Sequence, residues 1–506
     1  MNQGKFVVFA ALAVISSVLQ AEVKLACPFA DGMVLQRDRE VPVWGTADAG
    51  EQVKVMFADA EVSATADADG RWRVLLPAMS ASKEGRVLTV VSEKTKIPQT
   101  IADVLVGEVW YVCGQSNTEL PLYHQNPHFQ DRQGRMVAQM TRQPNIRYVH
   151  AADYRWSATP KSSPDYPVVW KKFLPENLGK APSFSAMGAY FALELYAALD
   201  VPIGLVGSYW GGTNIDAWTP REGYAGHEEA LKETVAWQTV TTHADWKKEM
   251  SKGAISGSHQ QPCVLWNEMV EPWCPMAMRG FIWYQGCHNW GEGALYRDKM
   301  HALYDGWSKK FENPGLKLYF VQLAPYNFSW WHLQLAQAKF AAEQPNAGMV
   351  NTVDIGNADD IHPNEKGAVG KRLAALALKH DYGFDLTADA PVLKGICSEE
   401  GQLILSFENA SGWYVYDPSW DVCQGFEIAG TDGVWKKAYV ANANGGAKVG
   451  KAWGTNGSVS GRDIILAADG VEKPMKVRYL YQQPWVGTLY ADSGLPLGPF
   501  EAEVGK

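Results

Sequence analysis

The pattern of apolar and polar positions divides the chain into three parts. Between residues 24 and 100, short β-prone runs alternate with turn signals such as Asp69-Gly70, which is typical of a small β-sandwich. From residue 101 to 381, apolar runs typical of buried strands alternate with stretches of helical periodicity. This alternation predicts a doubly wound parallel sheet, whose ligands lie beyond the carboxyl ends of the strands. After residue 388 β-prone runs return, and they predict a second β domain.

We therefore expect an α/β fold with flanking β-sandwich-type domains. The central domain, residues 103–385, would be a flavodoxin-like, three-layer domain with a parallel sheet. Residues 22–102 would form the N-terminal β-sandwich, and residues 386–506 the C-terminal β-rich domain. A chain of 506 residues is too long for one ordinary core, which favours two or three domains.

The first 21 residues have the features of a secretory signal peptide. Lys5 precedes an apolar run over residues 6–19, and Leu19-Gln20-Ala21 offers a cleavage site with a small residue. We expect a secreted or periplasmic protein without a membrane span, because no later apolar run is long enough. A lipid anchor at Cys27 is disfavoured, since Lys24 stands where a lipobox has an aliphatic residue.

Composition narrows the choice of partners. The formal net charge is −9 and there is no basic cluster, which argues against nucleic acid and anionic membranes. The 21 tryptophans suit stacking on sugar rings, although packing in β-rich cores explains them equally well. An odd number of cysteines, seven, leaves at least one thiol unpaired within the chain. Proximity favours the pairs Cys263/Cys274 and Cys397/Cys423, and no CxxC pattern indicates zinc.

The tetrapeptide Gly114-Gln115-Ser116-Asn117 follows the apolar run of residues 104–113. A serine at the carboxyl end of a buried strand lies where an α/β hydrolase places its nucleophile, although many loop serines only cap helices. The segment Asp359-Asp360-Ile361-His362-Pro363 supplies a base and carboxylates. Asp359, three residues before His362, leaves room for the chain to turn back, so we expect Asp359 rather than Asp360 to orient the imidazole.

Two further segments could stabilise an oxyanion. Gly211-Gly212-Thr213 follows a strand-like run, and its glycines let backbone N–H groups approach a ligand closely. Gln285 and Asn289 place amide side chains after another strand. We expect an oxyanion hole made by the N–H groups of Ser116 and Gly212 and the side chain of Gln285, with Asn289 as the alternate donor.

In this order the four segments resemble the SGNH hydrolase superfamily and, more narrowly, the sialate O-acetylesterase family. The resemblance covers nearly the whole expected mature chain. It includes Pro42-Val43-Trp44-Gly45 near the N-terminus and Gly494-Leu495-Pro496 near the C-terminus. It implies an SGNH fold and a serine esterase that removes O-acetyl groups from sugars, but it does not fix the substrate.

Three positions depart from the family pattern. Its third block usually reads Gln-Gly-Glu-Ser-Asn, and Cys287 and His288 stand where Glu and Ser are expected. Thr118 replaces the usual Met of the first block. The loss of a carboxylate at position 287 bears on substrate preference and on the pH profile. A nucleophile built from Cys287 and His288 is disfavoured, because adjacent side chains rarely point toward each other.

The predicted mechanism uses Ser116 as nucleophile, His362 as base and then acid, and Asp359 as the orienting carboxylate. It requires an O-acetylated sugar or polysaccharide as partner and no metal or cofactor. Two alternatives stay open: an acetylxylan- or pectin-type acetylesterase, and a non-catalytic carbohydrate-binding protein with a degenerate site.

Overall fold

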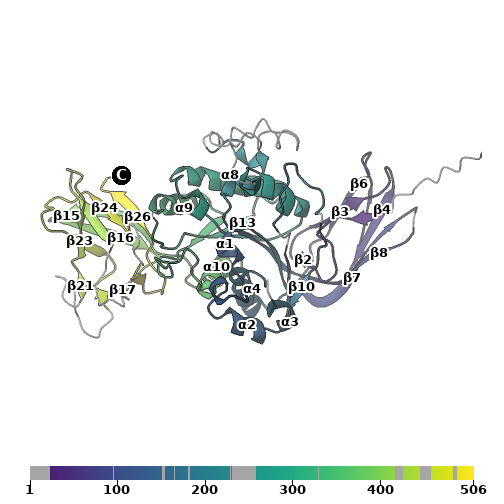
Figure 1. Ribbon diagram of the computed structural model, residues 1–506, viewed down its shortest axis with the longest axis horizontal. Helices are drawn as coiled ribbons and strands as arrows, with labels where there is room; N and C mark the ends of the chain where they lie inside the picture. The colour runs from purple at the N-terminus through teal and green to yellow at the C-terminus, as the bar shows by residue number, and fades with distance from the viewer. Residues whose placement is uncertain are drawn as a thin grey trace, which may run out of the picture.

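The computed structural model describes residues 23–94, 96–150, 154–164, 166–180, 183–227, 230, 258–328, 330–415, 425–444, 457–481 and 487–505. The expected signal peptide lies outside the described residues. Figure 1 shows the N-terminal strands, a central body of helices and strands, and the C-terminal strands following one another along the long axis.

A sheet in the order β10-β9-β11-β8-β12-β13-β14 forms the centre of the molecule. Its strands are β8 (Gln99–Gly114), β9 (Gln143–His150), β10 (Lys171–Phe173), β11 (Ile203–Tyr209), β12 (Gly280–Tyr284), β13 (Lys317–Val321) and β14 (Ala347–Val350). All neighbouring pairs are parallel except β10 with β9. The predicted α/β fold is confirmed, and the sheet is mixed because β10 is antiparallel and β8 also pairs with N-terminal strands.

Helices lie on both sides of this sheet (Figure 1). α4 (Ala186–Leu199) packs against α10 (Lys366–His380) on one side, and α8 (Leu295–Lys310) packs against α9 (Trp331–Glu343) on the other. α4 begins where the Ser185 side chain accepts the backbone N–H of Gly188, which satisfies a free donor of the first turn. Shorter helices and turns are α1 (Ser116–Glu119), α2 (Gly134–Met140), α3 (Pro175–Leu178), η1 (Pro127–Phe129), η2 (Ile215–Trp218), η3 (Arg221–Tyr224), η4 (Ser258–Gln260), η5 (Trp266–Val270), η6 (Glu271–Trp273) and η7 (Cys287–Asn289).

The N-terminal strands share their core with the central sheet. β1 (Lys24–Leu25), β3 (Val41–Thr46) and β6 (Arg71–Leu76) form one small sheet. β2 (Val34–Gln36) and β7 (Ser82–Ser92) pair with β8, and β4 (Gln52–Phe57) joins β7 to β5 (Ala60–Thr65). One continuous hydrophobic cluster runs from Val43 and Val55 through Leu105 to Phe281. The N-terminal strands and the central body therefore share one buried core.

The C-terminal strands have a core of their own, which includes Leu403, Phe407, Ile428 and Leu489. Within the described residues they form three four-stranded sheets. The strands are β15 (Val392–Glu399), β16 (Gln402–Glu408), β17 (Trp413–Val415), β18 (Phe426–Ala429), β19 (Lys436–Lys437), β20 (Tyr439–Val440), β21 (Ala443–Asn444), β22 (Gly457–Val459), β23 (Ile464–Ala467), β24 (Lys476–Tyr479), β25 (Leu489–Ala491) and β26 (Phe500–Glu503). The indole N–H of Trp331 in α9 donates to the Tyr479 carbonyl at 3.2 Å, which ties this part to the central body.

The cysteines of the described residues, Cys27, Cys113, Cys263, Cys274, Cys287 and Cys397, all carry free thiols. Cys263 and Cys274, one of the two pairs that proximity favours, are therefore not joined by a disulfide. Cys423 lies outside the described residues, so the other pair is not tested. No helix in the described ranges is long and apolar enough to cross a membrane.

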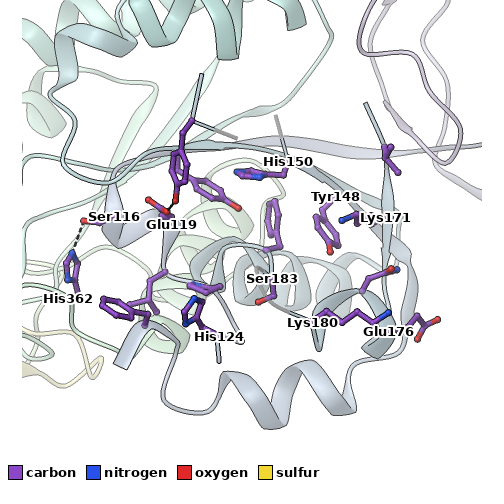
Figure 2. A pocket seen from close by; sticks show the side chains of 18 of the residues that line it. Ser116, Glu119, His124, Tyr148, His150, Lys171, Glu176, Lys180, Ser183 and His362 are labelled. Carbon is purple, nitrogen blue, oxygen red and sulfur yellow. Dashed lines mark hydrogen bonds between the residues drawn. The ribbon is translucent and has the colours of Figure 1, made fainter. Parts of the chain in front are cut away.

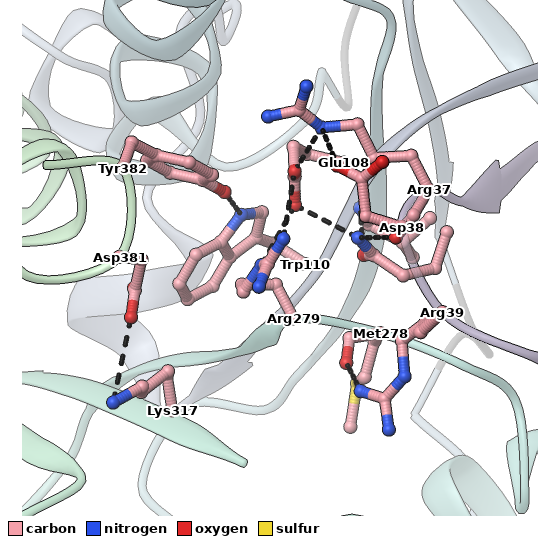
Figure 3. A network of polar contacts seen from close by, with 12 residues as sticks. Arg37, Asp38, Arg39, Glu108, Trp110, Met278, Arg279, Lys317, Asp381 and Tyr382 are labelled. Carbon is pink, nitrogen blue, oxygen red and sulfur yellow. Dashed lines mark hydrogen bonds and ion pairs between the residues drawn. The ribbon is translucent and has the colours of Figure 1, made fainter. Parts of the chain in front are cut away.

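A buried carboxylate joins the N-terminal strands to the central sheet (Figure 3). Glu108 in β8 is fully buried and accepts hydrogen bonds from Gln36 in β2, Arg37 and Arg279. Burial by itself would raise the pKa of Glu108, but the bonds and charges of Arg279 and Arg37 hold it below its usual value. The ionised form is therefore stabilised by folding.

We predict that Glu108→Gln destabilises the protein by up to about 3 kcal/mol, the low end of the cost of breaking a buried ion pair, because both arginines stay partly exposed. Folding lowers the pKa of Glu108, so the contribution of Glu108 to the free energy of unfolding is complete above the ordinary glutamate pKa of about 4.3. This contribution is lost as the pH falls through the pKa of Glu108 in the folded state. The measurement is the denaturant midpoint at pH 7. Glu312→Gln, in the exposed Arg73–Glu312 pair, is the matched control and should cost at most about 1 kcal/mol. Equal midpoints for the two variants would contradict the prediction.

Candidate active site

The turn after β8 places Ser116 at the carboxyl edge of the central sheet. Gly114 has φ +140°, and a Cβ atom there would lie 2.4 Å from the Tyr284 carbonyl oxygen. Only glycine fits this turn, because the backbone conformation and the close approach both exclude a side chain. The backbone N–H of Gln115 donates to the same carbonyl at 3.1 Å, so the turn is fixed to the end of β12.

Ser116 and His362 meet at this edge, although they are far apart in the sequence. The Oγ atom of Ser116 lies 2.8 Å from Nε2 of His362. In the neutral tautomer with the proton on Nδ1, the serine hydroxyl donates to Nε2, which is the arrangement of a nucleophile with its general base. Burial lowers the pKa of His362, with a further contribution from the charge of Lys366, whereas Asp360 acts in the opposite direction. The base is thus held in its proton-accepting form at neutral pH.

The structure brings Asp360, and not Asp359, to the imidazole. Asp360 Oδ1 lies 3.8 Å from His362 Nδ1, and no ion pair joins Asp359 to His362 in the described part of the chain. The reason is the local turn: the Asp360 carboxylate accepts the backbone N–H of His362 at 2.8 Å, which holds it on the same side of the turn as the imidazole. The backbone N–H of Asp359 instead donates to the Asn357 side chain, and the Asp359 carboxylate is exposed.

The glycine that faces Ser116 is Gly211 rather than Gly212. A Cβ atom at Gly211 would lie 3.2 Å from Ser116 Cβ, whereas one at Gly212, where φ is +69°, would meet no atom within 4 Å. The Gly211 N–H donates to Glu119 Oε2 at 2.7 Å. Glu119 also accepts the hydroxyl of Tyr154, and burial raises its pKa although both bonds act to lower it. A carboxylate therefore accepts the hydrogen bond of the glycine N–H that lies beside Ser116.

Gln285 and Asn289 lie together behind the site. Gln285 is fully buried, and its Nε2 donates to the Thr213 carbonyl at 2.9 Å and to Asn289 Oδ1 at 2.6 Å, so both amide hydrogens are used. Asn289 Oδ1 also accepts the backbone N–H of Ile215 at 3.0 Å. The buried Nδ2 of Asn289 makes no hydrogen bond of normal geometry in the described part of the structure. The Asn289 side chain acts to lower the pKa of Glu292 against the effect of burial, so its Nδ2 faces that carboxylate, and of the two amides Asn289 has the less firmly bonded donor.

A cleft of about 1040 Å³ extends from the serine (Figure 2). Ser116, Glu119 and His362 lie at one end of it, and Lys171, Glu176 and Lys180 at the other. The aromatic side chains of Tyr148, Phe184 and Tyr209 line the space between them. A cavity of this size and mixed lining suits a polar ligand as large as a substituted sugar. No cluster of three metal-ligating side chains occurs among the described residues.

The sequence reasoning missed Glu119 and Lys366. Glu119 stands three residues after Ser116, on the same turn of α1, and Lys366 stands four residues after His362. The spacing at which helical residues share a face was a usable signal for Glu119. For Lys366 the sequence held no comparable signal, because the burial of its side chain depends on contacts with distant segments.

A serine paired with an imidazole at the carboxyl edge of a largely parallel sheet is typical of a serine hydrolase. Residues 106–379 match the model of a family described as carbohydrate esterase, sialic acid-specific acetylesterase. The match spans more than half of the chain, and the protein belongs to this family. It is a carboxylic ester hydrolase that removes O-acetyl groups, as the sequence resemblance implied.

Individual relatives agree with this assignment. A carbohydrate acetylesterase from Xanthomonas citri of known structure is 31% identical, with a TM-score of 0.78, over 95% of this chain and 100% of that one. The sialate O-acetylesterase of Rattus norvegicus is 27% identical over 72% of this chain and 74% of its own length. The human sialate O-acetylesterase is 26% identical over 74% of this chain and 75% of its own length.

We predict that Asp360→Asn impairs catalysis more than Asp359→Asn. The loss in kcat/KM should be about tenfold, well below the ~10⁴ of a buried triad carboxylate, because Asp360 is half exposed and 3.8 Å from Nδ1. Since Asp360 raises the pKa of His362, its removal should also move the acid limb of the pH–rate profile to lower pH. Profiles of kcat/KM for both variants are the measurement. A larger loss in Asp359→Asn would restore the assignment made from the sequence.

Proposed function

We propose that the protein is an exported serine esterase that removes O-acetyl groups from sialic acids, with Ser116 as nucleophile and His362 as general base. The 2.8 Å contact between Ser116 Oγ and His362 Nε2, at one end of the cleft, is the observation that carries this proposal. The family and the named activities of the relatives support the substrate class. We assign the central body to the SGNH type with flanking β-sandwich domains.

In the proposed reaction Ser116 Oγ attacks the acetyl carbonyl while His362 Nε2 takes the hydroxyl proton. The tetrahedral intermediate collapses when His362 returns this proton to the leaving sugar oxygen. Water, activated by the same imidazole, then releases acetate from the acyl-enzyme. Asp360 stabilises the imidazolium that forms in each step, because it is the carboxylate nearest to Nδ1.

The far end of the cleft supports an acidic sugar as substrate. Lys171 and Lys180 line the cleft away from Ser116 (Figure 2). Their ammonium groups offer partners to a sugar carboxylate, and the adjacent Glu176 offers an acceptor to sugar hydroxyls. A sialic acid carries both kinds of group and an acetyl ester.

We predict that Ser116→Ala lowers the rate of deacetylation by at least about 10³, because the covalent step is lost. The thermal midpoint should be unchanged, since Ser116 is partly exposed and loses one hydroxyl. Ser398→Ala, on strand β15 of the C-terminal part, is the matched control and should keep full activity. Near-normal turnover of Ser116→Ala would overturn the proposed mechanism.

The same assay, run on acetylated sialic acid, acetylated xylo-oligosaccharide and p-nitrophenyl acetate, tests the substrate. Wild-type enzyme should show its highest kcat/KM on the acetylated sialic acid. A preference for the xylo-oligosaccharide would assign the enzyme to neutral plant polysaccharides instead.

We predict that Asn289 is the side-chain donor of the oxyanion hole. Asn289→Ala should lower kcat by roughly 10²–10³ with little change in KM, the usual effect of losing one such donor. Gln285→Ala should act through Asn289, because both Nε2 hydrogens of Gln285 are used by Asn289 Oδ1 and the Thr213 carbonyl and none is left for the reacting group. The double variant should therefore be no slower than Asn289→Ala. Losses that add in the double variant would give Gln285 an independent contact with the reacting group.

A further inference from the structure

A buried lysine lies beneath the two loops that carry Ser116 and His362, and the mechanism above gives it no role. Lys366, the first residue of α10, is fully buried, which is rare for a lysine without an anionic partner. Its Nζ donates to Asn117 Oδ1 at 2.6 Å and lies 5.1 Å above the centre of the Tyr284 ring. No carboxylate forms an ion pair with it within the described ranges.

Asn117 connects the two catalytic loops. It follows Ser116 directly, and its Nδ2 donates at 3.1 Å to the carbonyl of Ile361, the residue before His362. An amide side chain can rotate by 180° and exchange its donor for its acceptor. The ammonium form of Lys366 disfavours the exchanged orientation, because an ammonium group needs an acceptor such as Oδ1, which leaves Nδ2 facing Ile361. The distance between the nucleophile and base loops thus depends on the lysine.

Cys287, Asp131 and Asp360 act on the charge of Lys366, although none of them forms an ion pair with it in the described part of the chain. Asp131 accepts the Lys366 backbone N–H at 2.9 Å and also binds the Tyr190 hydroxyl of α4. Cys287, from the turn after β12, is the other group that faces the ammonium, and burial raises the pKa of its thiol to about 12. The thiol therefore stays neutral where the family usually has Glu. Asp360, on the loop before α10, is half exposed to solvent.

The charge of Lys366 acts on His362. Burial lowers the pKa of Lys366 to about 7, so the ammonium form dominates in the acid range where His362 titrates. In that range the buried cation opposes protonation of the imidazole.

We propose that Lys366 is a positioning residue of the esterase site, which fixes Asn117 as the bridge between the loops of Ser116 and His362 and places a buried ammonium group behind these two loops. This inference rests on the roles proposed for Ser116 and His362. It also assigns a consequence to Cys287, since a neutral residue there leaves the lysine charge free to act on the base.

The test is the pH profile of kcat/KM with p-nitrophenyl acetate for wild type and three variants. Lys366→Met should move the acid limb of the profile to higher pH by up to about one unit, because His362 loses a neighbouring positive charge. Its plateau should fall about ten- to a hundredfold, because Asn117 is no longer fixed. Lys371→Met, on the same helix in an exposed pair with Glu194, is the matched control and should leave the profile unchanged.

Cys287→Glu separates the two effects. It places a carboxylate beside Lys366 and offsets its charge, while the three ammonium hydrogens still allow the bond to Asn117. The acid limb should move upward as in Lys366→Met, but the plateau should stay within a few-fold of wild type. If Lys366→Met does not fold, the acid limb of Cys287→Glu decides the question alone.

An acid limb that stays in place in the folded variants would overturn the inference. If Ser116→Ala is inactive while the acid limbs of Lys366→Met and Cys287→Glu stay at the pH of wild type, the inference on Lys366 fails and the proposed mechanism stands. If Ser116→Ala is active, the proposed mechanism itself fails.

Discussion

Strand β8 is the constraint on which the rest of the structure depends. Its first half pairs with β2 and β7, and its second half lies between β11 and β12 in the central sheet. One strand therefore belongs to the N-terminal strands and to the catalytic sheet, and the two parts cannot pack independently. Glu108, at the middle of β8, is anchored by arginines from both sides, and Gly114, at its end, sets the direction of the Ser116 loop. A shift in the register of β8 would move the nucleophile away from His362.

The catalytic residues come from loops, so their relative positions depend on a few buried polar contacts. Asn117 bonds the carbonyl before His362, and Gln285 bonds both the Thr213 carbonyl and Asn289. Each of these amides is buried and joins segments far apart in the sequence. Leaving a buried amide without its partner costs more free energy than the hydrogen bond itself contributes to stability. These contacts therefore strongly favour one arrangement of the loops.

The α/β fold could be predicted from local patterns of apolar residues, and the serine–histidine pair from two motifs that resemble those of a known hydrolase family. Apolar runs located β8, β11, β12 and β13, and the motif around Ser116 marked the end of a strand. The choice between Asp359 and Asp360 could not be predicted, since it depends on a turn in which Asp360 bonds the backbone of His362. Which of the two glycines faces Ser116 likewise depends on the conformation of the loop after β11, which the sequence does not specify. The core that the N-terminal strands share with the central sheet and the burial of Lys366 could not be predicted either, because both depend on contacts between segments far apart in the sequence.

The charges around Ser116 oppose one another in their effect on the reaction. Lys366 in its protonated form is a buried cation bonded to Asn117, the residue after Ser116, and favours negative charge near the nucleophile, whereas Glu119 places a partly buried carboxylate on the N–H of the glycine that faces Ser116. Glu119 also occupies the Gly211 N–H, so an acetyl oxygen must displace it before that donor can act. The substrate binding energy that displaces Glu119 is then no longer available to hold the sugar. The Nδ2 of Asn289 faces the Glu292 carboxylate without a hydrogen bond of normal geometry, so it is held less firmly than the Gly211 N–H, which favours an oxyanion hole built on this side chain over one built on the glycine loop.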